Sequence, residues 1–476
     1  MNLNQTLQEK YPHLEVSVLK LSEVKKNIDF RIDDSFWTMK LIYNNKLNYK
    51  KIGECLLKSQ YGISINMNEG GDGIPIYRMN DIDNMLCNFE VKKYALIDKN
   101  ELQTFRLNYG DVLFNRTNSY EFVGRTGIFY NNRENFVFAS YLVRLVCNKE
   151  ILLPEYLTVF LNTHIGKKEI RRRARPSINQ TNVNPEELKE IKIPIFPMEF
   201  QLEIQNLVKD SHKALEESKE LYKKAEETLY LELGLDPKNP LQSLLDSKTN
   251  NPTNSLNISI RTLKESFLKT GRLDSEYYQS KYEDIEKFIK SYPNGYDSFS
   301  NIINNKDTNF TPKNNENYSY IELANIGNNG NISEPISDLG KNLPTRARRI
   351  VSKGDVIISS IEGSLSSCAL ITQEFDKHLV STGFFVLNSK LLNGETLLVM
   401  FKSQIFQEYL KKFPSGTILC AINKEELSKI LIPKIDSTTQ EKIAKYIQES
   451  FNLRKKSKQL LDNAKNKVEE QIQGKT

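Results

Sequence analysis

The sequence predicts an α+β protein built from one internal repeat, in which each of two globular units is followed by a long helix. Three observations predict this fold: short motifs that recur in the same order in both halves, a heptad pattern that ends each half, and a break rich in Pro, Asn and Ser between the halves. The 476 residues, 39% hydrophobic and 26% charged, are enough for two or three folded domains.

Four motifs carry the repeat. Arg31-Ile-Asp-Asp-Ser-Phe-Trp37 recurs 241 residues later as Arg272-Leu-Asp-Ser-Glu-Tyr-Tyr278, and Gly110-Asp-Val-Leu113 recurs 244 residues later as Gly354-Asp-Val-Ile357. The segment from Glu186 to Pro194 recurs 239 residues later from Glu425 to Pro433, and Gln201 recurs as Gln440. Generic strand and turn motifs are the alternative, but they do not explain four matches in one order.

Each half ends in a heptad pattern, which predicts a long helix. Apolar or small residues alternate at spacings of four and three, at Ile204, Val208, Ser211, Leu215, Ser218, Tyr222, Ala225 and Leu229, and again at Ile443, Ile447, Ser450, Arg454, Ser457, Leu461, Ala464 and Val468. Only Arg454 interrupts the second stripe. We expect the two helices to pack on each other, because either stripe alone would face water. The alternative is that each helix covers only its own unit.

The apolar seam of this helix pair is predicted at Ile204, Val208, Leu215, Tyr222, Leu229, Ile443, Ile447, Leu461 and Val468. The predicted boundaries are 1–197 for the first unit, 198–234 for the central helix, 235–256 for a linker, 257–437 for the second unit and 438–474 for the C-terminal helix. Within the units, strands are expected at 141–146 and 383–387, and helical stretches at 155–161 and 395–409.

No catalytic or metal-binding motif stands out. The five cysteines and four histidines are scattered, and none of the three Asn-Pro pairs continues into the Pro-aromatic sequence of an adenine methyltransferase loop. Glu90-Val-Lys92 with Asp72 or Asp83 loosely fits a metal-dependent nuclease, but such triplets arise freely in a chain rich in Glu and Lys. We therefore predict no catalytic residue, no metal and no cofactor. The polar N-terminus and the absence of a long apolar run predict a cytoplasmic protein without a membrane contact.

Basic and amide clusters are the candidates for contact with DNA. The run 167–175 holds six positive side chains around one acid, and the net charge of the chain is +6. Such clusters suit phosphate contacts, while Arg and Asn can read base edges; a solvated helix face is the alternative. The candidates are Arg78, Asn80, Arg116, Asn118, Arg125, Lys168, Arg171, Arg172, Arg173, Arg175, Arg346, Arg348, Arg349, Lys411 and Lys412.

The duplicated motifs resemble those of specificity subunits of Type I restriction–modification systems, over nearly the whole chain. The resemblance implies two target-recognition domains, each reading half of a split double-stranded DNA site, joined by an antiparallel helix pair with a pseudo-twofold repeat. It also implies two methyltransferase (modification) subunits and restriction/translocase subunits as partners, which would carry S-adenosylmethionine, ATP and Mg. Two features depart from the family pattern: Arg454 in the second stripe, and Asp436 where the first half has Pro197.

A helix from Gln201 to Leu233 would be about 50 Å long at about 1.5 Å per residue, which equals roughly 15 base pairs. We therefore expect half-sites whose centres lie on the order of one helical turn apart, with an unread spacer between them. Two other functions stay open: the recognition part of a fused or Type II-like restriction–methylation enzyme, which would need catalytic motifs on this chain, and a coiled-coil scaffold that does not bind DNA.

Overall fold

The computed structural model describes residues 3–474 except 15, 17, 29, 40, 42, 132–134, 179, 247–259 and 417–418. The chain divides into two compact units, one formed by 1–215 and 455–476 and the other by 216–454. Within the predicted linker, 235–256, α9 spans Pro240–Asp246, and residues 247–256 lie outside the described residues. None of the helices that the structure describes combines the length and the apolar content needed to cross a membrane.

The first unit is an α+β fold around a mixed six-stranded sheet. Its strand order is β2-β11-β7-β9-β5-β4, with β2 (Leu56–Tyr61), β11 (Leu142–Cys147), β7 (Val112–Asn115), β9 (Thr126–Ile128), β5 (Leu86–Cys87) and β4 (Ile82–Asp83). Smaller sheets are formed by β1 (Tyr49–Lys51) with β14 (Lys192–Pro194), by β10 (Val137–Phe138), β3 (Ile74–Tyr77) and β6 (Tyr94–Ala95), and by β12 (Arg175–Ser177), β13 (Gln180–Asn182) and β8 (Thr117–Asn118). Its helices are α1 (Leu3–Lys10), α2 (Leu21–Val24), α3 (Asp34–Thr38), α4 (Lys99–Phe105), α5 (Pro154–Asn162), α6 (His164–Arg173) and α7 (Pro185–Lys189).

The second unit has the same kind of body with two four-stranded sheets. One is ordered β16-β23-β20-β21, with β16 (Ile303–Asn305), β23 (Phe384–Ser389), β20 (Val356–Ser359) and β21 (Cys368–Leu370). The other contains β18 (Ile336–Leu339), β17 (Asn317–Ile321), β22 (Leu379–Ser381) and β19 (Ala347–Ile350), and β15 (Tyr296–Ser298) pairs with β24 (Leu431–Pro433). Its helices are α10 (Phe267–Thr270), α11 (Ser280–Lys290), α12 (Phe299–Ile302), α13 (Gly394–Lys402), α14 (Gln404–Leu410) and α15 (Lys424–Lys429).

The repeat predicted from the motifs is present in the fold. In both units the strand that begins at the valine of Gly-Asp-Val lies between a long antiparallel strand and a shorter one, as β7 between β11 and β9, and as β20 between β23 and β21. Two helices, a hairpin or turn, a short helix and the Ile-Pro strand then follow in the same order. The predicted α+β class and internal repeat are therefore confirmed.

One helix prediction is wrong. The stretch 395–409 is not one helix, because Ser403 separates α13 from α14. Ser403 has extended backbone angles, and its side chain accepts a hydrogen bond from the backbone N–H of Phe406. A serine side chain that bonds the backbone in this way starts a new helix rather than continuing the old one.

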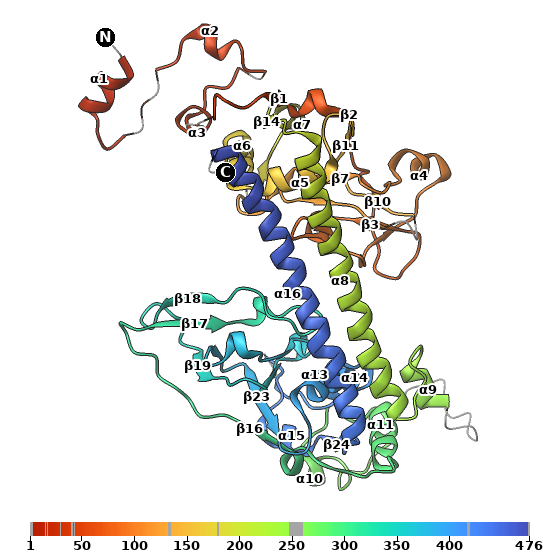
Figure 1. Ribbon diagram of the computed structural model, residues 1–476. Coiled ribbons are helices and arrows are strands. Elements are labelled where there is room, and N and C mark those ends of the chain that lie inside the picture. Colours follow the sequence, from red (N-terminus) through yellow and green to blue (C-terminus); the bar gives the residue numbers. More distant parts are fainter. Residues whose placement is uncertain are drawn as a thin grey trace. The chain divides into compact units, whose positions relative to one another are not determined.

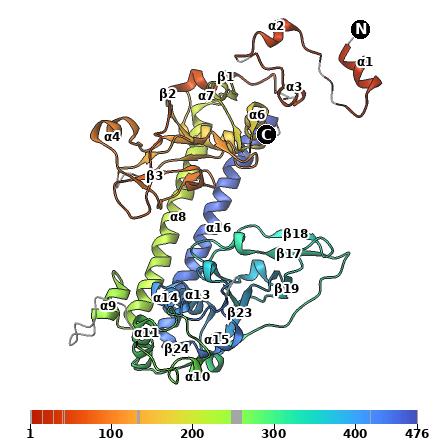
Figure 2. The same ribbon diagram turned by 180° about the vertical axis from the view of Figure 1, so that it is seen from behind.

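The two long helices, α8 (Met198–Glu232) and α16 (Ser437–Gln473), pack in antiparallel fashion within each unit. Within each unit the two helices lie side by side (Figures 1 and 2). In the first unit Ser211 and Ser457 share a buried hydrogen bond of 2.8 Å, and in the second unit Ser218 and Ser450 share one of 2.9 Å. In both pairs the residue numbers add up to 668, so both follow one register. The small heptad positions are thus places of close approach between backbones.

The seam residues predicted from the heptads are buried, except that Leu215 is half-buried. The buried ones are Ile204, Val208, Tyr222, Leu229, Ile443, Ile447, Leu461 and Val468. The core of the first unit contains Ile204, Val208, Leu461 and Val468. The core of the second unit contains Tyr222, Leu229, Ile443 and Ile447. Each half of the helix pair therefore completes the core of one unit.

Arg454, which interrupts the second stripe, turns to the body of its own unit. Its Nε donates to Ser218 Oγ at 3.1 Å and one terminal nitrogen donates to Asn331 Oδ1 at 2.9 Å. Burial lowers the pKa of this guanidinium. Arg454 thus ties the helix pair to the loop after Gly327, a contact that an aliphatic residue could not make.

We expect Glu226 on α8 to make the stability of the second unit depend on pH. Burial raises the pKa of its carboxyl to about 7, and the neighbouring Lys402 only partly opposes this shift. The folded state favours the protonated acid, so its contribution to stability is full below about pH 4.5 and is lost as the pH rises to about 7.

We expect Glu226→Gln to raise the free energy of unfolding at pH 8 by about 2 kcal/mol, after a discount for partial solvent access, and to change little at pH 4.5. Urea unfolding followed by circular dichroism at both pH values measures this difference. Glu220→Gln, an exposed acid on the same helix, is the matched control. If the free energy of unfolding depends equally on pH in the wild type and in Glu226→Gln, burial does not raise the pKa of this carboxyl.

Candidate nucleic-acid interface

The first repeated motif forms a buried ionic clasp in the first unit. Arg31 Nε and Nη2 donate to the two oxygens of Asp33 at 2.7 and 2.8 Å, and Nη1 donates to Glu187 at 2.8 Å. The same Nη1 also donates to the backbone carbonyl of Arg173 at 2.9 Å. Arg31 is 5% exposed and Glu187 is 2% exposed, so this clasp lies in the protein interior.

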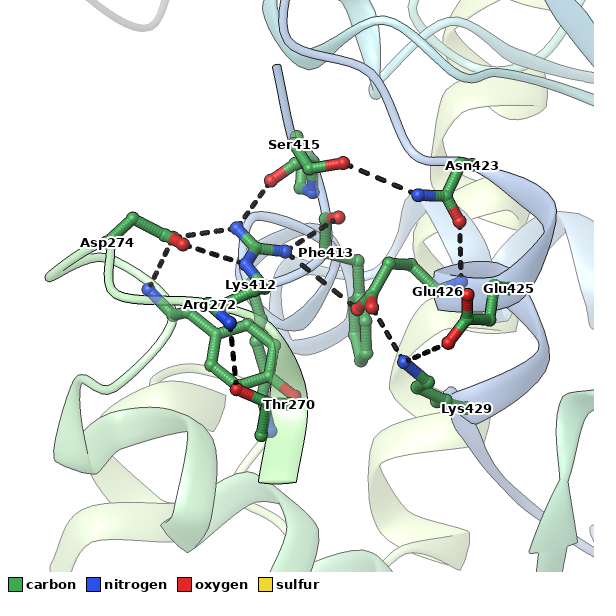
Figure 3. Close-up of polar contacts among 12 residues, drawn as sticks. Thr270, Arg272, Asp274, Lys412, Phe413, Ser415, Asn423, Glu425, Glu426 and Lys429 are labelled. Atoms are coloured by element: carbon green, nitrogen blue, oxygen red, sulfur yellow. Dashed lines mark hydrogen bonds and ion pairs between the residues drawn. The ribbon is translucent and has the colours of Figure 1, made fainter. Parts of the chain in front are cut away.

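The second unit repeats the clasp residue for residue (Figure 3). Arg272 holds both oxygens of Asp274 at 2.7 and 2.8 Å, and its Nη1 lies 3.8 Å from Glu426. Its guanidinium donates to the carbonyls of Phe413 and Pro414 at 3.2 and 2.7 Å. The hydrogen bonds from Arg272 lower the pKa of Asp274, which keeps that partner ionised.

The two aromatic residues of the motif complete each clasp. The guanidinium of Arg31 lies over the ring of Phe36 at 4.8 Å, and that of Arg272 lies over Tyr277 at 4.5 Å. Trp37 donates its ring N–H to the carbonyl of Arg31 at 2.7 Å. Tyr278 does the same to Arg272 with its hydroxyl, at 3.0 Å.

The other repeated motifs are also structural. Asp111 accepts the backbone N–H of Asn108 at 2.8 Å, as Asp355 does from Ser352, each after a turn whose glycine has a φ near +90°. Gln201 accepts the backbone N–H of Leu153 at 2.9 Å, and Gln440 accepts that of Asn393 at 2.9 Å. The duplicated motifs therefore hold the framework of each unit.

Each clasp fixes the root of a hairpin. In the first unit α6 leads into β12 and β13, and Arg175 adds a 2.8 Å ion pair with Glu187. β13 in turn pairs with β8, with Asn182 opposite Thr117. In the second unit Ala421 is bridged to both Ser415 and Ile361. These hairpins stand at equivalent places in the repeat.

A cation-rich face surrounds the first hairpin. Its side chains come from α6, from the loop 119–125 and from the end of α16. The pKa of Lys167 is lowered first by burial and then by the positive charges of Lys465, Arg171 and Arg125. The carboxylate of Glu469 opposes this shift, so the cations lie near one another with one acid beside them. We call Arg125, Lys167, Arg171 and Lys465 the basic face.

Aromatic rings support two of these cations. The guanidinium of Arg171 lies 5.6 Å from the centre of the Tyr120 ring, and that of Arg125 lies 4.1 Å from the centre of the Phe122 ring. A guanidinium that lies over an aromatic ring can still donate hydrogen bonds to a phosphate or a base.

The structure brings together some of the predicted contact residues. Arg125 and Arg171 lie on the basic face, and the half-buried Lys168 shares α6 with Arg171. Asn118 lies on β8 beside the hairpin, next to Arg116, whose guanidinium covers the ring of Tyr61 at 5.1 Å. These remain our predicted contacts.

Other predicted residues have internal partners. Arg172 donates to the carbonyl of Phe36 at 2.6 Å, and Arg78 pairs with Asp81 at 3.3 Å beside the exposed Asn80. The prediction for Arg173 is wrong, because this side chain is 7% exposed and bonds to the buried Glu169. A run of six cations therefore mixes framework residues with surface residues, which the sequence pattern does not separate.

In the second unit the predicted cations are dispersed. Lys411 pairs with Glu408 at 2.7 Å, and Lys412 pairs with Glu286. Arg348 donates to Thr345 and Thr311 at 3.0 and 3.2 Å. Arg349 donates to the carbonyl of Phe384, while Arg346 is exposed on the segment that leads into β19. The two units thus present different polar surfaces on one framework.

The sequence pattern missed two cationic features of the first unit. Lys465 belongs to α16, 290 residues away from Arg175, so only the folded chain places it on the basic face. A hollow of about 780 Å³ beside α4 is lined by Lys58, Lys99, Arg106 and Arg144 and by no acid. Its cations come from separate elements and form no run in the sequence.

The described residues contain no group of three or more His, Cys, Asp or Glu side chains placed to hold a metal ion. The nuclease-like triplet at Glu90 is part of this search, and Glu90, Asp72 and Asp83 are all exposed.

A duplicated α+β framework with a cation-rich face on one unit defines a class of protein suited to a polyanion. Residues 64–227 match the family model of the Type I restriction modification DNA specificity domain. The chain is 22% identical to the putative type I restriction enzyme MjaX specificity subunit of Methanocaldococcus jannaschii over 415 residues, which are 86% of this chain and 88% of that relative.

A shorter stretch of 159 residues is 30% identical to the HindI specificity subunit of Haemophilus influenzae and covers 32% of this chain and 33% of that one. The crystal structure of a Type-I restriction-modification S subunit from M. genitalium covers 90% of this chain and 96% of its own, at 14% identity and a TM-score of 0.42. The resemblance to Type I specificity subunits predicted from the duplicated motifs is confirmed by the sequence comparisons.

The basic face gives a direct prediction about salt. If Lys167 and Arg171 each contact one phosphate, Lys167→Ala and Arg171→Ala should each reduce the slope of log K against log salt by about 0.9. Filter binding or anisotropy over a salt series measures this slope. Lys287→Ala, which removes one exposed charge from α11, should leave the slope unchanged. Equal slopes for all three variants would remove the basic face from the interface.

Proposed function

We propose that this chain is the DNA-specificity subunit of a Type I restriction–modification complex. The observation that carries the proposal is the contrast within the repeat: the clasp, the Gly-Asp turn and the helix-start glutamine are the same in both units, while the polar surfaces around the hairpins differ. Two domains that recognise different DNA sequences need one framework and two different surfaces. The match of residues 64–227 to the DNA specificity domain supports this function.

In this proposal the first unit reads one half of a split site and the second unit reads the other half. Cations of the basic face contact phosphates, and Arg116 and Asn118 beside the hairpin reach base edges, where Arg suits guanine and Asn suits adenine. Distinct polar groups at the two hairpins then select different bases.

We propose further that the chain does no chemistry itself. It would direct two methyltransferase subunits, and in a larger assembly restriction/translocase subunits, to the bound site. S-adenosylmethionine, ATP and Mg would be held by those partners. The proposal rests on the family resemblance and on the absence of a catalytic motif from the sequence.

A chain that carries the first unit twice tests whether each unit recognises its own half-site. Residues 31–196 replace residues 272–435, so that both clasps and both helix starts are kept. If each unit reads its own half-site, the complex with the methyltransferase partner should bind and methylate a palindrome built from the first half-site and its inverted copy. Retention of the original asymmetric site by the chain that carries the first unit twice would rule out recognition by separate units.

A further inference from the structure

An exposed aliphatic side chain stands at the turn of each hairpin. Ile178 directly follows β12 and is 91% exposed, while Ser177 and Gln180 face each other across the hairpin. In the second unit Leu419 lies between Ser415 and Ala421, which are bridged to each other, and is 58% exposed. Single exposed aliphatic residues are common, but these two occupy equivalent places in a repeat whose surfaces otherwise differ.

In each unit the clasp bonds the chain directly before its hairpin. Arg31 bonds the chain at the carbonyl of Arg173, two residues before β12, and Arg272 bonds the carbonyl of Pro414, directly before Ser415. Figure 3 shows this second root, with Asn423 donating to Ser415 Oγ at 3.4 Å on the returning strand. The buried ionic clasp therefore anchors the segment from which each hairpin begins.

The elements that adjoin the first hairpin indicate a nucleic-acid occupant. α6 carries Lys167 and Arg171 and leads directly into the hairpin, and Arg125 lies on the loop that follows β8. Arg171 lies over Tyr120 and Arg125 over Phe122 on these elements, and such cations favour phosphates as neighbours over the apolar surface of a protein partner. An apolar tip beside phosphate-binding side chains is the arrangement with which proteins insert a wedge between base pairs from the minor groove.

We propose that Ile178 enters the minor groove of the half-site bound by the first unit and partly unstacks one base step, with Leu419 as its counterpart in the second unit. This inference rests on the proposed function. An unstacked step lowers the cost of turning a base out of the helix, which an enzyme that modifies a base must do. The hairpin thereby prepares the DNA for the partner subunit.

The test uses the full chain with its methyltransferase partner and duplexes that carry 2-aminopurine at successive positions of the first half-site. The wild-type complex should raise the fluorescence at one step. Ile178→Ala should abolish that rise and weaken binding about tenfold, because the complex loses the aliphatic side chain that is buried between the base pairs. Ile178→Leu, which keeps the apolar volume, should retain both effects. Leu57→Ala, which truncates another exposed aliphatic of the same unit, should change neither.

Each outcome decides the matter. An Ile178→Ala complex with unchanged fluorescence and affinity overturns the wedge, and so does a variant that loses the methyltransferase subunit on size exclusion, since the tip would then contact protein. If the wild-type complex does not distinguish its site from a scrambled duplex, the proposed function itself fails. Thermal unfolding of Ile178→Ala should match the wild type, because the side chain is exposed.

Discussion

Arg31→Ala should lower the free energy of unfolding of the first unit by about 3 kcal/mol, because it removes one of the two arginines that pair with the buried Glu187. Arg175 still pairs with Glu187, so the loss stays near the lower end of the range for broken buried ion pairs. The substitution also removes the ion pair with Asp33 and the hydrogen bond to the carbonyl of Arg173, which loosens the start of the hairpin.

Trp37 is the only tryptophan of the chain and donates to the carbonyl of Arg31, so it reports on this clasp. Urea unfolding followed by Trp37 fluorescence should show an earlier transition for Arg31→Ala. Arg272→Ala breaks the equivalent clasp of the second unit and is the matched control, with an unchanged Trp37 transition. Coincident curves for Arg31→Ala and the wild type would mean that the clasp does not stabilise the unit.

Removing one heptad from each long helix should shorten the preferred spacer of the DNA site by about 3 base pairs, because seven residues of helix span about 10 Å. The matched deletion takes residues 211–217 from α8 and 450–456 from α16. After this deletion the apolar stripe of each helix continues without a break. Ser218 then faces Ser457, in the same register as the native serine pairs. Binding to duplexes with spacers of graded length measures the change.

A deletion of the same heptad from α8 alone is the control. It puts the stripes of the two helices out of register over half their length, so we expect weakened folding and no new preferred spacer. A doubly deleted chain that folds and keeps the original spacer would show that helix length does not set the distance between half-sites.

Much of the fold could be predicted from the sequence, because periodic burial and repeated motifs are local signals. The ends of α8 and α16 fall within two residues of the ranges 198–234 and 438–474 predicted for them. The split of 395–409 at Ser403 was missed, since a serine inside an apolar helix pattern does not reveal whether it caps. The motif that begins at Arg31 signalled the repeat, but its buried clasp with Glu187 joins residues 156 positions apart.

The interface was less predictable for a physical reason. A cation in a basic run can pair inward or face solvent, and the choice depends on tertiary neighbours. Arg171 and Arg173 are two positions apart, yet one is exposed over Tyr120 and the other is buried against Glu169. Lys465 reaches the basic face only through the folding of α16 into the first unit.

The central claim is that the two units read two separate DNA sequences for a partner that acts on them. It is tested most directly by mapping modified bases in a genome whose host expresses this chain with its methyltransferase subunit. The account predicts one bipartite motif: two short specified sequences separated by an unspecified spacer of fixed length, and absent when this chain is deleted. A continuous motif, or the same modified sites without this chain, would contradict the account.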